Sequence, residues 1–582
     1  MVKERIMRTT AKKVIALICV ITTCVALIFG AAACGETAGA SVTLDKDEIT
    51  LETGGSYTLI AETSPTGAKI EWITDNDKVA TVENGKVTAV GVGVTVITAK
   101  IDGASAKCKV TVNKKTAEDG PLAEFGLNDT PARIDINTSD GNPIPGEGRN
   151  QPYVACSVSV DGYGSGTDFD NIAAEVRIRG NNTAEYEKKP YRLKFGSKRN
   201  LLGLNDGAEC KNWVLLACYK DVTFLRDALA FEVGEMTLAK DGYYVSDYSY
   251  AELYINGEYN GFYMVAEQQQ VNPNRVDIAE PELNYEGTDI GYFVEYDGNA
   301  YMETPDVKFD VDYSAYPMTL ENGSSKIPSQ YPFTRPVYYT IKNDMYGADA
   351  MNRPQYLFAK KYTENVFDIL YKAMVKGEYC KFDENYDVVP SELTDSRAVV
   401  ESVVNLDSWV EMVVVQEFCR DNDVDWSSFF LSFDMSATGN KKLTFQAPWD
   451  FDNGFGMKMG FEDATGFACA NSNTTMGGLN PWLALGYQSD WFMKLAAEKW
   501  ESLIADGLAE RANKLIDTVT EEYESYFAKN YEKWDNLNEC MDPIMNPAIV
   551  SQFKTHADAA AYLKGWVNKR IAWLNGAFAE YL

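Results

Sequence analysis

Aspartates gather in two short segments in the second half of the chain. Asp421, Asp423 and Asp425 alternate in RDNDVDWSS, and Asp450 and Asp452 alternate in QAPWDFDNGFG. Carboxylates held this close raise one another's pKa unless a cation lies between them. Oxygen ligands without histidine or cysteine are typical of Mg²⁺, Mn²⁺ or Ca²⁺ sites rather than of Zn²⁺ sites. The two segments therefore predict a site for a divalent metal ion.

The residues between the two acidic segments indicate how they could meet. SSFFLSF and KKLTFQAPW both have strand-like composition, and the turn MSATGN separates them. If the two strands pair as neighbours, the acidic segment before the first and the one after the second lie at the same edge of a sheet. Four or five carboxylates then share one small site.

Two familiar kinds of site do not fit the sequence. An EF-hand loop that begins at Asp421 needs glycine at its sixth position and glutamate at its twelfth, where this chain has Trp426 and Ser432. His556 is the single histidine of the chain, which excludes HExxH and other histidine-rich zinc sites. The chemistry must therefore rest on carboxylates, lysines and arginines.

A basic segment, RIRGNNTAEYEKKPYRLKFGSKR, precedes the acidic ones. In its strand PYRLKF, the alternation of side chains places Arg192 and Lys194 on one face. This face predicts an anion site, and phosphates beside a carboxylate-held metal are the basis of phosphoryl transfer. The alternative is that these cations pair with Glu185 and Glu187 at the surface.

The length of the chain predicts its number of folded units, and its net charge limits its partners. A chain of 582 residues is expected to form two or more folded units. Its net charge of -31 repels phosphate backbones and anionic lipids, so nucleic acid is not an expected partner.

The N-terminus has the pattern of a secretion signal. Basic residues precede the apolar stretch VIALICVITTCVALIFGAAAC, and small residues lie directly before Cys34. This arrangement resembles a bacterial lipobox, which predicts a signal peptide at residues 1–33 and a lipid anchor at Cys34. The alternative is an uncleaved membrane helix. In either case most of the chain is expected outside the cytoplasm, at the outer face of the cell membrane.

The remaining chain divides into two expected units. Residues 41–112 are short alternating strands with turn signals, typical of a small β-sandwich, and closely resemble a bacterial Ig-like domain of group 2. Residues 113–124 are polar with a Gly-Pro break and indicate a linker. Residues 125–582 mix strands and helices, with a mostly helical C-terminal part, so this unit is predicted to be α+β.

Several segments of the second unit have clear local patterns. AELYINGEYNGFYMVAEQ predicts a β-hairpin that turns at Asn256-Gly257. DVTFLRDALAFEVGEM has helical spacing at Val222, Leu225, Leu229 and Val233, and residues 353–377 and 404–420 have helical periodicity. EVRIRG, PYRLKF and NWVLLACY are strand-like.

Five blocks of this unit resemble, in order and spacing, the CotH-like kinase family, which is named after a spore coat protein. They are RIRGNNTAEYEKKPYRLKF, NWVLLACYKDVTFLRDALAFEV, AELYINGEYNGFYMVAEQ, QEFCRDNDVDWSSFFLSFD and LTFQAPWDFDNGFG. The resemblance implies a large α+β atypical kinase-like domain after the Ig-like sandwich. It also implies transfer of the ATP γ-phosphate to Ser or Thr of secreted or coat proteins, with Mg²⁺ or Mn²⁺ as cofactor.

The resemblance also implies roles for single residues. The family's catalytic aspartate falls on Asp423, with Asp425 as the alternative, and its metal-binding aspartate falls on Asp450, supported by Asp452. Asp421 stands where the family has asparagine. The residues expected to contact the nucleotide, or to support those that do, are Arg179, Lys189, Arg192, Lys194, Glu267 and Ser428.

Two other functions remain open from the sequence. One is a surface adhesion or scaffold lipoprotein, in which the Ig-like unit binds wall polymer or carbohydrate and the acidic site holds a structural Ca²⁺. The other is an extracellular glycosidase that uses a pair of carboxylates.

Overall fold

The computed structural model describes residues 40–52, 55–90, 93–113, 120–146, 151–162, 167–302, 307–322, 325–331, 337–343, 353–421, 423–468, 480–537 and 545–582. The predicted signal peptide, Cys34 and residues 114–119 of the predicted linker lie outside these residues. In the described part of the chain, no helix is both long and apolar enough to cross a membrane. The chain forms two compact units that divide at residues 112–113.

The first unit is all β, as its alternating sequence predicts. Its sheets have the strand orders β2-β9-β8-β5, β3-β7-β6 and β1-β4. Alternate residues of the long strand β8 are buried, which builds the core between sheets. The strands are β1 (Ser41–Leu44), β2 (Glu48–Glu52), β3 (Ser56–Thr58), β4 (Ala61–Ser64), β5 (Glu71–Thr74), β6 (Ala80–Glu83), β7 (Lys86–Ala89), β8 (Gly93–Ile101) and β9 (Ala104–Asn113).

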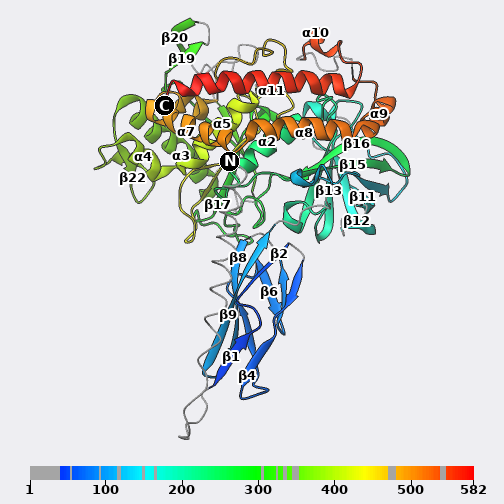
Figure 1. The fold of residues 1–582 in the computed structure, drawn as a ribbon. Helices are drawn as coiled ribbons and strands as arrows, with labels where there is room; N and C mark the ends of the chain where they lie inside the picture. Colours follow the sequence, from blue (N-terminus) through cyan, green and yellow to red (C-terminus); the bar gives the residue numbers. More distant parts are fainter. Residues whose placement is uncertain are drawn as a thin grey trace, which may run out of the picture. The chain divides into compact units, whose positions relative to one another are not determined.

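The second unit begins with a closed barrel of strand order β10-β11-β12-β13-β14-β16-β15 (Figure 1). Neighbouring strands are antiparallel, except that β10 and β15 close the barrel in parallel. The predicted strands and the hairpin at Asn256-Gly257 are confirmed, with both turn residues at positive φ. The strands are β10 (Ala132–Thr138), β11 (Val154–Asp161), β12 (Phe169–Ile178), β13 (Tyr191–Arg199), β14 (Cys210–Leu216), β15 (Tyr248–Ile255) and β16 (Glu258–Glu267).

Helix α2 (Arg226–Met236) follows β14 and is shorter than the helical spacing predicts. Val222 and Leu225 precede it, because the Asp221 carboxylate accepts hydrogen bonds from the main-chain N–H groups of Thr223 and Arg226 and holds the segment in a turn. Both side chains are still buried. The apolar spacing therefore marks the buried face but not the start of the helix.

A second sheet of the same unit has the order β18-β21-β17-β24-β25. The predicted pairing across MSATGN is confirmed, because Leu431 and Ser432 of β24 lie opposite Phe445 and Thr444 of β25. β25 has only two residues, and the chain leaves the strand conformation at Ala447, whose φ is 59°. The strands are β17 (Gly291–Tyr296), β18 (Lys308–Val311), β21 (Val337–Ile341), β24 (Phe429–Asp434) and β25 (Thr444–Phe445), and the small hairpins are β19 (Met318–Asn322) with β20 (Ser325–Tyr331) and β22 (Cys380–Phe382) with β23 (Val388–Pro390).

Helices complete the second unit, most of them in the C-terminal part. The long helix α11 packs against α7, α8 and α9 and runs across them in Figure 1. The helices are α3 (Pro354–Tyr371), α4 (Ser396–Val403), α5 (Leu406–Cys419), α6 (Pro481–Gly486), α7 (Asp490–Ala505), α8 (Leu508–Glu522), α9 (Glu524–Lys533), α10 (Pro547–Val550) and α11 (His556–Ala579). The predicted class, an all-β unit before a larger α+β unit with a helical C-terminal part, is confirmed.

Candidate functional site

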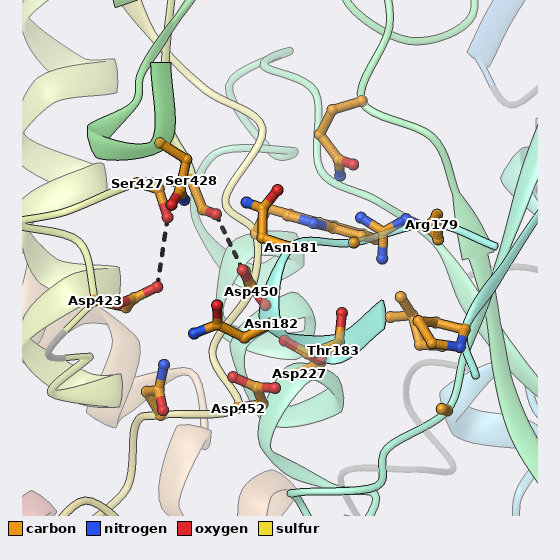
Figure 2. Close-up of a pocket in the computed structure, with 18 of the residues that line it drawn as sticks. Arg179, Asn181, Asn182, Thr183, Asp227, Asp423, Ser427, Ser428, Asp450 and Asp452 are labelled. Atoms are coloured by element: carbon orange, nitrogen blue, oxygen red, sulfur yellow. Dashed lines mark hydrogen bonds between the residues drawn. The ribbon is translucent and has the colours of Figure 1, made fainter. Parts of the chain in front are cut away.

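The two acidic segments meet at one edge of the second sheet. Asp423 lies between α5 and β24, and Asp450 follows β25, so the β24–β25 pairing brings the two segments together. The Ser428 hydroxyl donates a hydrogen bond to Asp450 Oδ2 at 3.1 Å. The Ser427 hydroxyl donates to Asp423 Oδ2 over a longer distance, 3.4 Å. Figure 2 shows both contacts on the same side of the site.

A cavity of about 580 Å³ contains these carboxylates. The barrel lines one side of it, the segment around Asp423 and Asp450 lines another, and the connection Gln268–Gln270 joins the two. Among the aspartates that line the cavity, four from three separate segments face a common space in Figure 2: Asp227, Asp423, Asp450 and Asp452. Asp221 and Asp297 also line the cavity.

Burial and mutual repulsion raise the pKa values of these acids. For Asp227, burial is the main cause, followed by the charges of Asp452 and Asp450. Burial also raises the pKa of Asp450, with the charge of Asp423 as the next cause. Burial raises the pKa of Asp452 to about 6, although nearby Lys220 opposes the change. This part of the cavity therefore carries negative charge that a bound cation would stabilise.

Two buried lysines lie close to the acids. Lys220, four residues after the end of β14, places Nζ 2.8 Å from Asp452 Oδ1. Burial disfavours the charged form of Lys220, but Asp452 and the other acids outweigh it and raise the pKa of the lysine. Lys458 is also buried and lines the cavity. Burial raises the pKa of Asp423, and the charges of Lys220 and Lys458 oppose this change. Both lysines are positioned to balance the acids or to bind an anion beside them.

A short loop from the barrel crosses the cavity. It runs from Gly180 through Thr183 in the connection between β12 and β13, and Figure 2 shows Asn181, Asn182 and Thr183 beside Asp450 and Asp227. Gly180 has a φ of 97°, and a Cβ there would lie 2.0 Å from Thr183 Oγ1. Glycine is therefore required for this tight turn.

The backbone is strained where the two acidic segments touch. Ser428 and Asp450 have φ values of 62° and 69°, in the left-handed region. The Ser428 main-chain N–H donates to Glu295 Oε1 at 3.1 Å, and Glu295 also forms an ion pair with Lys342. Non-glycine residues in this region cost about 1–3 kcal/mol and persist where surrounding contacts hold them, often at functional sites.

The cavity contains some of the predicted site residues but not all of them. Asp423, Asp450, Asp452, Ser428, Arg179 and Arg192 line it. The side chain of Asp425 is buried outside the cavity lining, although this residue was the alternative catalytic carboxylate. This placement favours Asp423 over Asp425 at the cavity.

Three other predicted site residues do not line the cavity and form hydrogen bonds or ion pairs with other residues. Lys189 donates to the main-chain oxygen of Ala184, and Lys194 forms a half-exposed ion pair with Glu175. Glu267 is fully buried and pairs with Arg275 at 2.9 Å, not with a lysine of the basic segment. The alternating pattern of PYRLKF places Arg192 and Lys194 on one face, but only Arg192 lines the cavity.

Sequence reasoning missed Lys220, Asp227, Lys458 and the Asn181–Thr183 loop. Lys220 and Asp227 lie seven residues apart in YKDVTFLRD, a block quoted above for its resemblance to the family rather than for its charges. The available signal was the charged residues Lys220 and Asp227 in a segment that follows a strand. Lys458 had none, because it lies in GFGMKMG without other charges beside it.

The donor set fits a metal ion that shares its ligands with a substrate. Within the described residues, no three Asp, Glu, His or Cys side chains form a group that could hold a metal ion. Mg²⁺ is commonly held by one or two carboxylates, with phosphate and water oxygens completing its six ligands. Asp450 and Asp452 can supply such carboxylates if Lys220 shifts away from Asp452.

Comparison with known proteins agrees with both predicted resemblances. The model of the bacterial Ig-like domain (group 2) matches residues 38–115. No curated protein matches the chain. Among solved structures, the surface layer protein SbsC, domains 4–9, matches at 13% identity over 29% of this chain and 30% of that chain, with a TM-score of 0.12. The model of the CotH kinase protein matches residues 176–329 and 357–574, more than half of the chain, which therefore belongs to the CotH kinase family.

Proposed function

We propose that the second unit is an atypical protein kinase that transfers the γ-phosphate of ATP to a Ser or Thr hydroxyl, with Mg²⁺ or Mn²⁺ as cofactor. One observation carries the proposal: Asp423 and Asp450, from two separate segments, line one cavity with buried lysines and a glycine-dependent loop. Carboxylates, cations and a covering loop in one cleft are the parts that phosphoryl transfer requires. Family membership supports the same reaction class.

Asp423 is the residue proposed to orient the acceptor hydroxyl. Its Oδ2 already accepts a hydrogen bond from a serine hydroxyl, that of Ser427. An acceptor serine or threonine that replaces this contact would donate to the same oxygen. The carboxylate would then take the hydroxyl proton as the acceptor oxygen bonds to the γ-phosphorus and the bond from that phosphorus to the β,γ-bridging oxygen breaks, which releases ADP.

Asp450 and Asp452 are the proposed metal ligands, and the metal supplies neutralisation of phosphate charge when it is bound. Ser428 holds Asp450 through its hydrogen bond, which fixes the orientation of the carboxylate. Lys220 lies beside Asp452 and can reach a phosphate oxygen by a small movement. Arg179 lines the same cavity, where burial lowers its pKa and the nearby charges of Asp450 and Asp227 partly oppose this change.

The loop Gly180–Thr183 is proposed to cover the phosphates. Main-chain N–H groups of a tight, glycine-containing turn can donate to phosphate oxygens. The side chains of Asn181, Asn182 and Thr183 add further donors at the cavity. The loop lies between two strands of the barrel, and the proposed role is that of the glycine-rich loop that covers the phosphates in protein kinases.

The acceptor is proposed to be a secreted or surface protein. The N-terminal sequence predicts export and a lipid anchor at Cys34, which would place the kinase unit outside the membrane. The Ig-like unit is the proposed contact to wall polymer or carbohydrate. A spore coat protein is one acceptor that the family name suggests.

The test is transfer of label from γ-labelled ATP by the purified full-length protein, with Mg²⁺ or Mn²⁺ and a generic protein acceptor. Asp423→Asn and Asp450→Asn are expected to lower the rate at least about 10³-fold, because each removes a charge used in the transition state. Asp425→Asn is the matched control and is expected to retain activity, because Asp425 does not line the cavity.

Other outcomes separate this proposal from its alternatives. Label transfer that survives Asp423→Asn but is lost in Asp425→Asn would exchange the roles of the two aspartates. Stabilisation by Ca²⁺ alone, without transfer or any response to nucleotide, would replace the kinase by the scaffold function.

A further inference from the structure

Two arginines face each other at the barrel side of the cavity. Arg177 of β12 lies directly opposite Arg192 of β13 in the strand register, and both line the cavity. Like charges directly opposite each other destabilise a strand pair. A fold that keeps such a pair on a cavity wall needs a compensating anion or a strong structural reason.

The contacts of the two arginines among the described residues are with neutral groups and not with a carboxylate. Arg177 Nη1 donates to the main-chain oxygen of Gln151 at 3.4 Å, and its guanidinium lies 4.9 Å from the centre of the Tyr153 ring. Arg192 Nη2 donates to Asn212 Oδ1 at 3.2 Å. Among the described residues, neither arginine has an ion pair, and the buried Nε atoms of both have no hydrogen-bond acceptor.

Three other cations of this region are paired with carboxylates. Arg275 pairs with Glu267, Lys220 with Asp452 and Lys342 with Glu295. Burial lowers the pKa of Arg192, and the neighbouring arginines Arg177, Arg179 and Arg275 lower it further. The wall around Arg192 is therefore positive, in a protein whose net charge is -31.

This positive wall is distinct from the acidic part of the cavity. Arg177 and Arg192 donate to Gln151 and Asn212, and among the described residues neither arginine is hydrogen-bonded or ion-paired to an aspartate. Asn212 connects Arg192 to Gln270 through its own hydrogen bond at 3.1 Å, toward the connection between barrel and second sheet. Nucleotide phosphates bound at the aspartates thus leave this pair of guanidinium groups without a partner.

We propose that Arg177 and Arg192 form a second anion subsite in the cavity, which binds a phosphate or carboxylate group of the acceptor rather than a phosphate of the nucleotide. Two guanidinium groups with free donors match the oxygens of such a group, and the hydrogen bonds to a charged partner are strong. The proposal rests on the kinase function proposed above. It makes an acidic or already phosphorylated protein segment the preferred acceptor.

The direct test is titration of the full-length protein with inorganic phosphate by calorimetry, alone and at saturating non-hydrolysable ATP analogue with Mg²⁺. Phosphate is expected to bind in both conditions. Arg192→Gln is expected to weaken phosphate binding about tenfold or more, because charge-assisted hydrogen bonds are lost. Lys194→Gln is the matched control: it removes the same charge from the same strand, but Lys194 is paired with Glu175 and does not line the cavity.

Arg177→Gln is the second variant and is expected to weaken phosphate binding like Arg192→Gln. It replaces the first variant if Arg192→Gln lowers the midpoint of thermal unfolding. Competition between phosphate and the ATP analogue would assign the arginines to the nucleotide and overturn the proposal. Equal phosphate affinity of the wild type, both arginine variants and the Lys194 control would overturn it as well.

Labelling rates of three acceptor peptides distinguish a carboxylate from a phosphate as the bound anion. The peptides carry Asp, phosphoserine or Asn two residues from the target serine. Faster labelling of the Asp or the phosphoserine peptide, with the advantage lost in Arg192→Gln, identifies a carboxylate or a phosphate respectively. Equal labelling of all three contradicts the acceptor assignment. If no peptide is labelled, the proposed kinase function fails, while the phosphate titration still tests the subsite.

Discussion

Two groups of buried charged residues lie near the C-terminal end of α5. In one group opposite charges form an ion pair, and in the other carboxylates face one another. Glu417 and Arg570 form a fully buried ion pair at 2.7 Å. Arg570 also donates to the main-chain oxygens of Glu417, Ala464 and Gly466, and Glu417 accepts from the main-chain N–H of Ala468. Asp423, four residues after Cys419, instead faces three other aspartates across a cavity.

The difference separates a structural use of charge from a functional one. A buried ion pair with satisfied hydrogen bonds holds helices α5 and α11 together and leaves nothing to bind. A buried group of like charges with raised pKa values costs stability, and it is retained where a ligand or reaction needs it. We therefore expect substitutions in the two clusters to have opposite effects on stability.

Arg570→Met is expected to have the largest effect. The substitution leaves Glu417 buried without its cation, which costs about 3–5 kcal/mol in the free energy of unfolding. Urea denaturation followed by circular dichroism measures the change. A loss below about 1 kcal/mol would mean that this ion pair resembles an exposed one.

His556→Gln tests a third buried group, which is held neutral. Burial lowers the pKa of His556 from 6.5 to about 4, and its ring stacks on Phe527. The unfolded chain binds the proton more readily, so this residue makes stability fall as the pH drops from 6.5 to about 4, by up to about 3 kcal/mol. The variant is expected to be less stable at pH 7 but to lose less stability between pH 7 and pH 4, as measured by urea denaturation at each pH. An unchanged pH dependence would show that another group causes it.

Asp227→Asn is expected to stabilise the protein by on the order of 1 kcal/mol at pH 7. The amide oxygen can still accept the hydrogen bond that Phe451 N–H donates to Asp227 Oδ1 at 2.7 Å, while the buried charge is removed. Because the folded-state pKa of Asp227 is raised, the cost of its charge is absent below about pH 4 and grows as the pH rises. Thermal unfolding at pH 4 and pH 8 checks that the advantage of the variant is larger at pH 8. A destabilised variant would mean that a cation already balances this carboxylate.

Lys194→Gln is expected to have the smallest effect, below about 0.5 kcal/mol, because its ion pair with Glu175 is exposed to water. The same urea denaturation measures it. A larger loss would show that surface charge, and not only buried charge, stabilises the barrel.

The proximity of Asp423 and Asp450 was predictable from the sequence because it depends only on local strand and turn patterns. Two apolar runs on either side of a turn pair as neighbours, and the residues beyond them then lie at the same edge. The Asn256-Gly257 hairpin and the sandwich of the first unit follow from equally local rules. The apolar face of the segment before α2 was visible for the same reason.

The partners of these aspartates were not predictable by local patterns. Lys220 and Asp227 come from a segment more than 200 residues before Asp450, and only the packing of the barrel beside the second sheet brings them together. Alternation identified the face with Arg192 and Lys194 but not which of the two would line the cavity. Glu267 lies at the end of its strand as expected, yet its cation is Arg275, which lies eight residues further along the chain.

We propose that the aspartate group binds a metal ion together with a nucleotide. The most direct measurement is the thermal unfolding midpoint of the wild type and of Asp450→Asn with Mn²⁺, with a non-hydrolysable ATP analogue, and with both. We predict that the wild type is stabilised substantially only when both are present, and that Asp450→Asn abolishes this increase. Equal stabilisation of the two proteins, or stabilisation of the wild type by the metal alone, would contradict the claim.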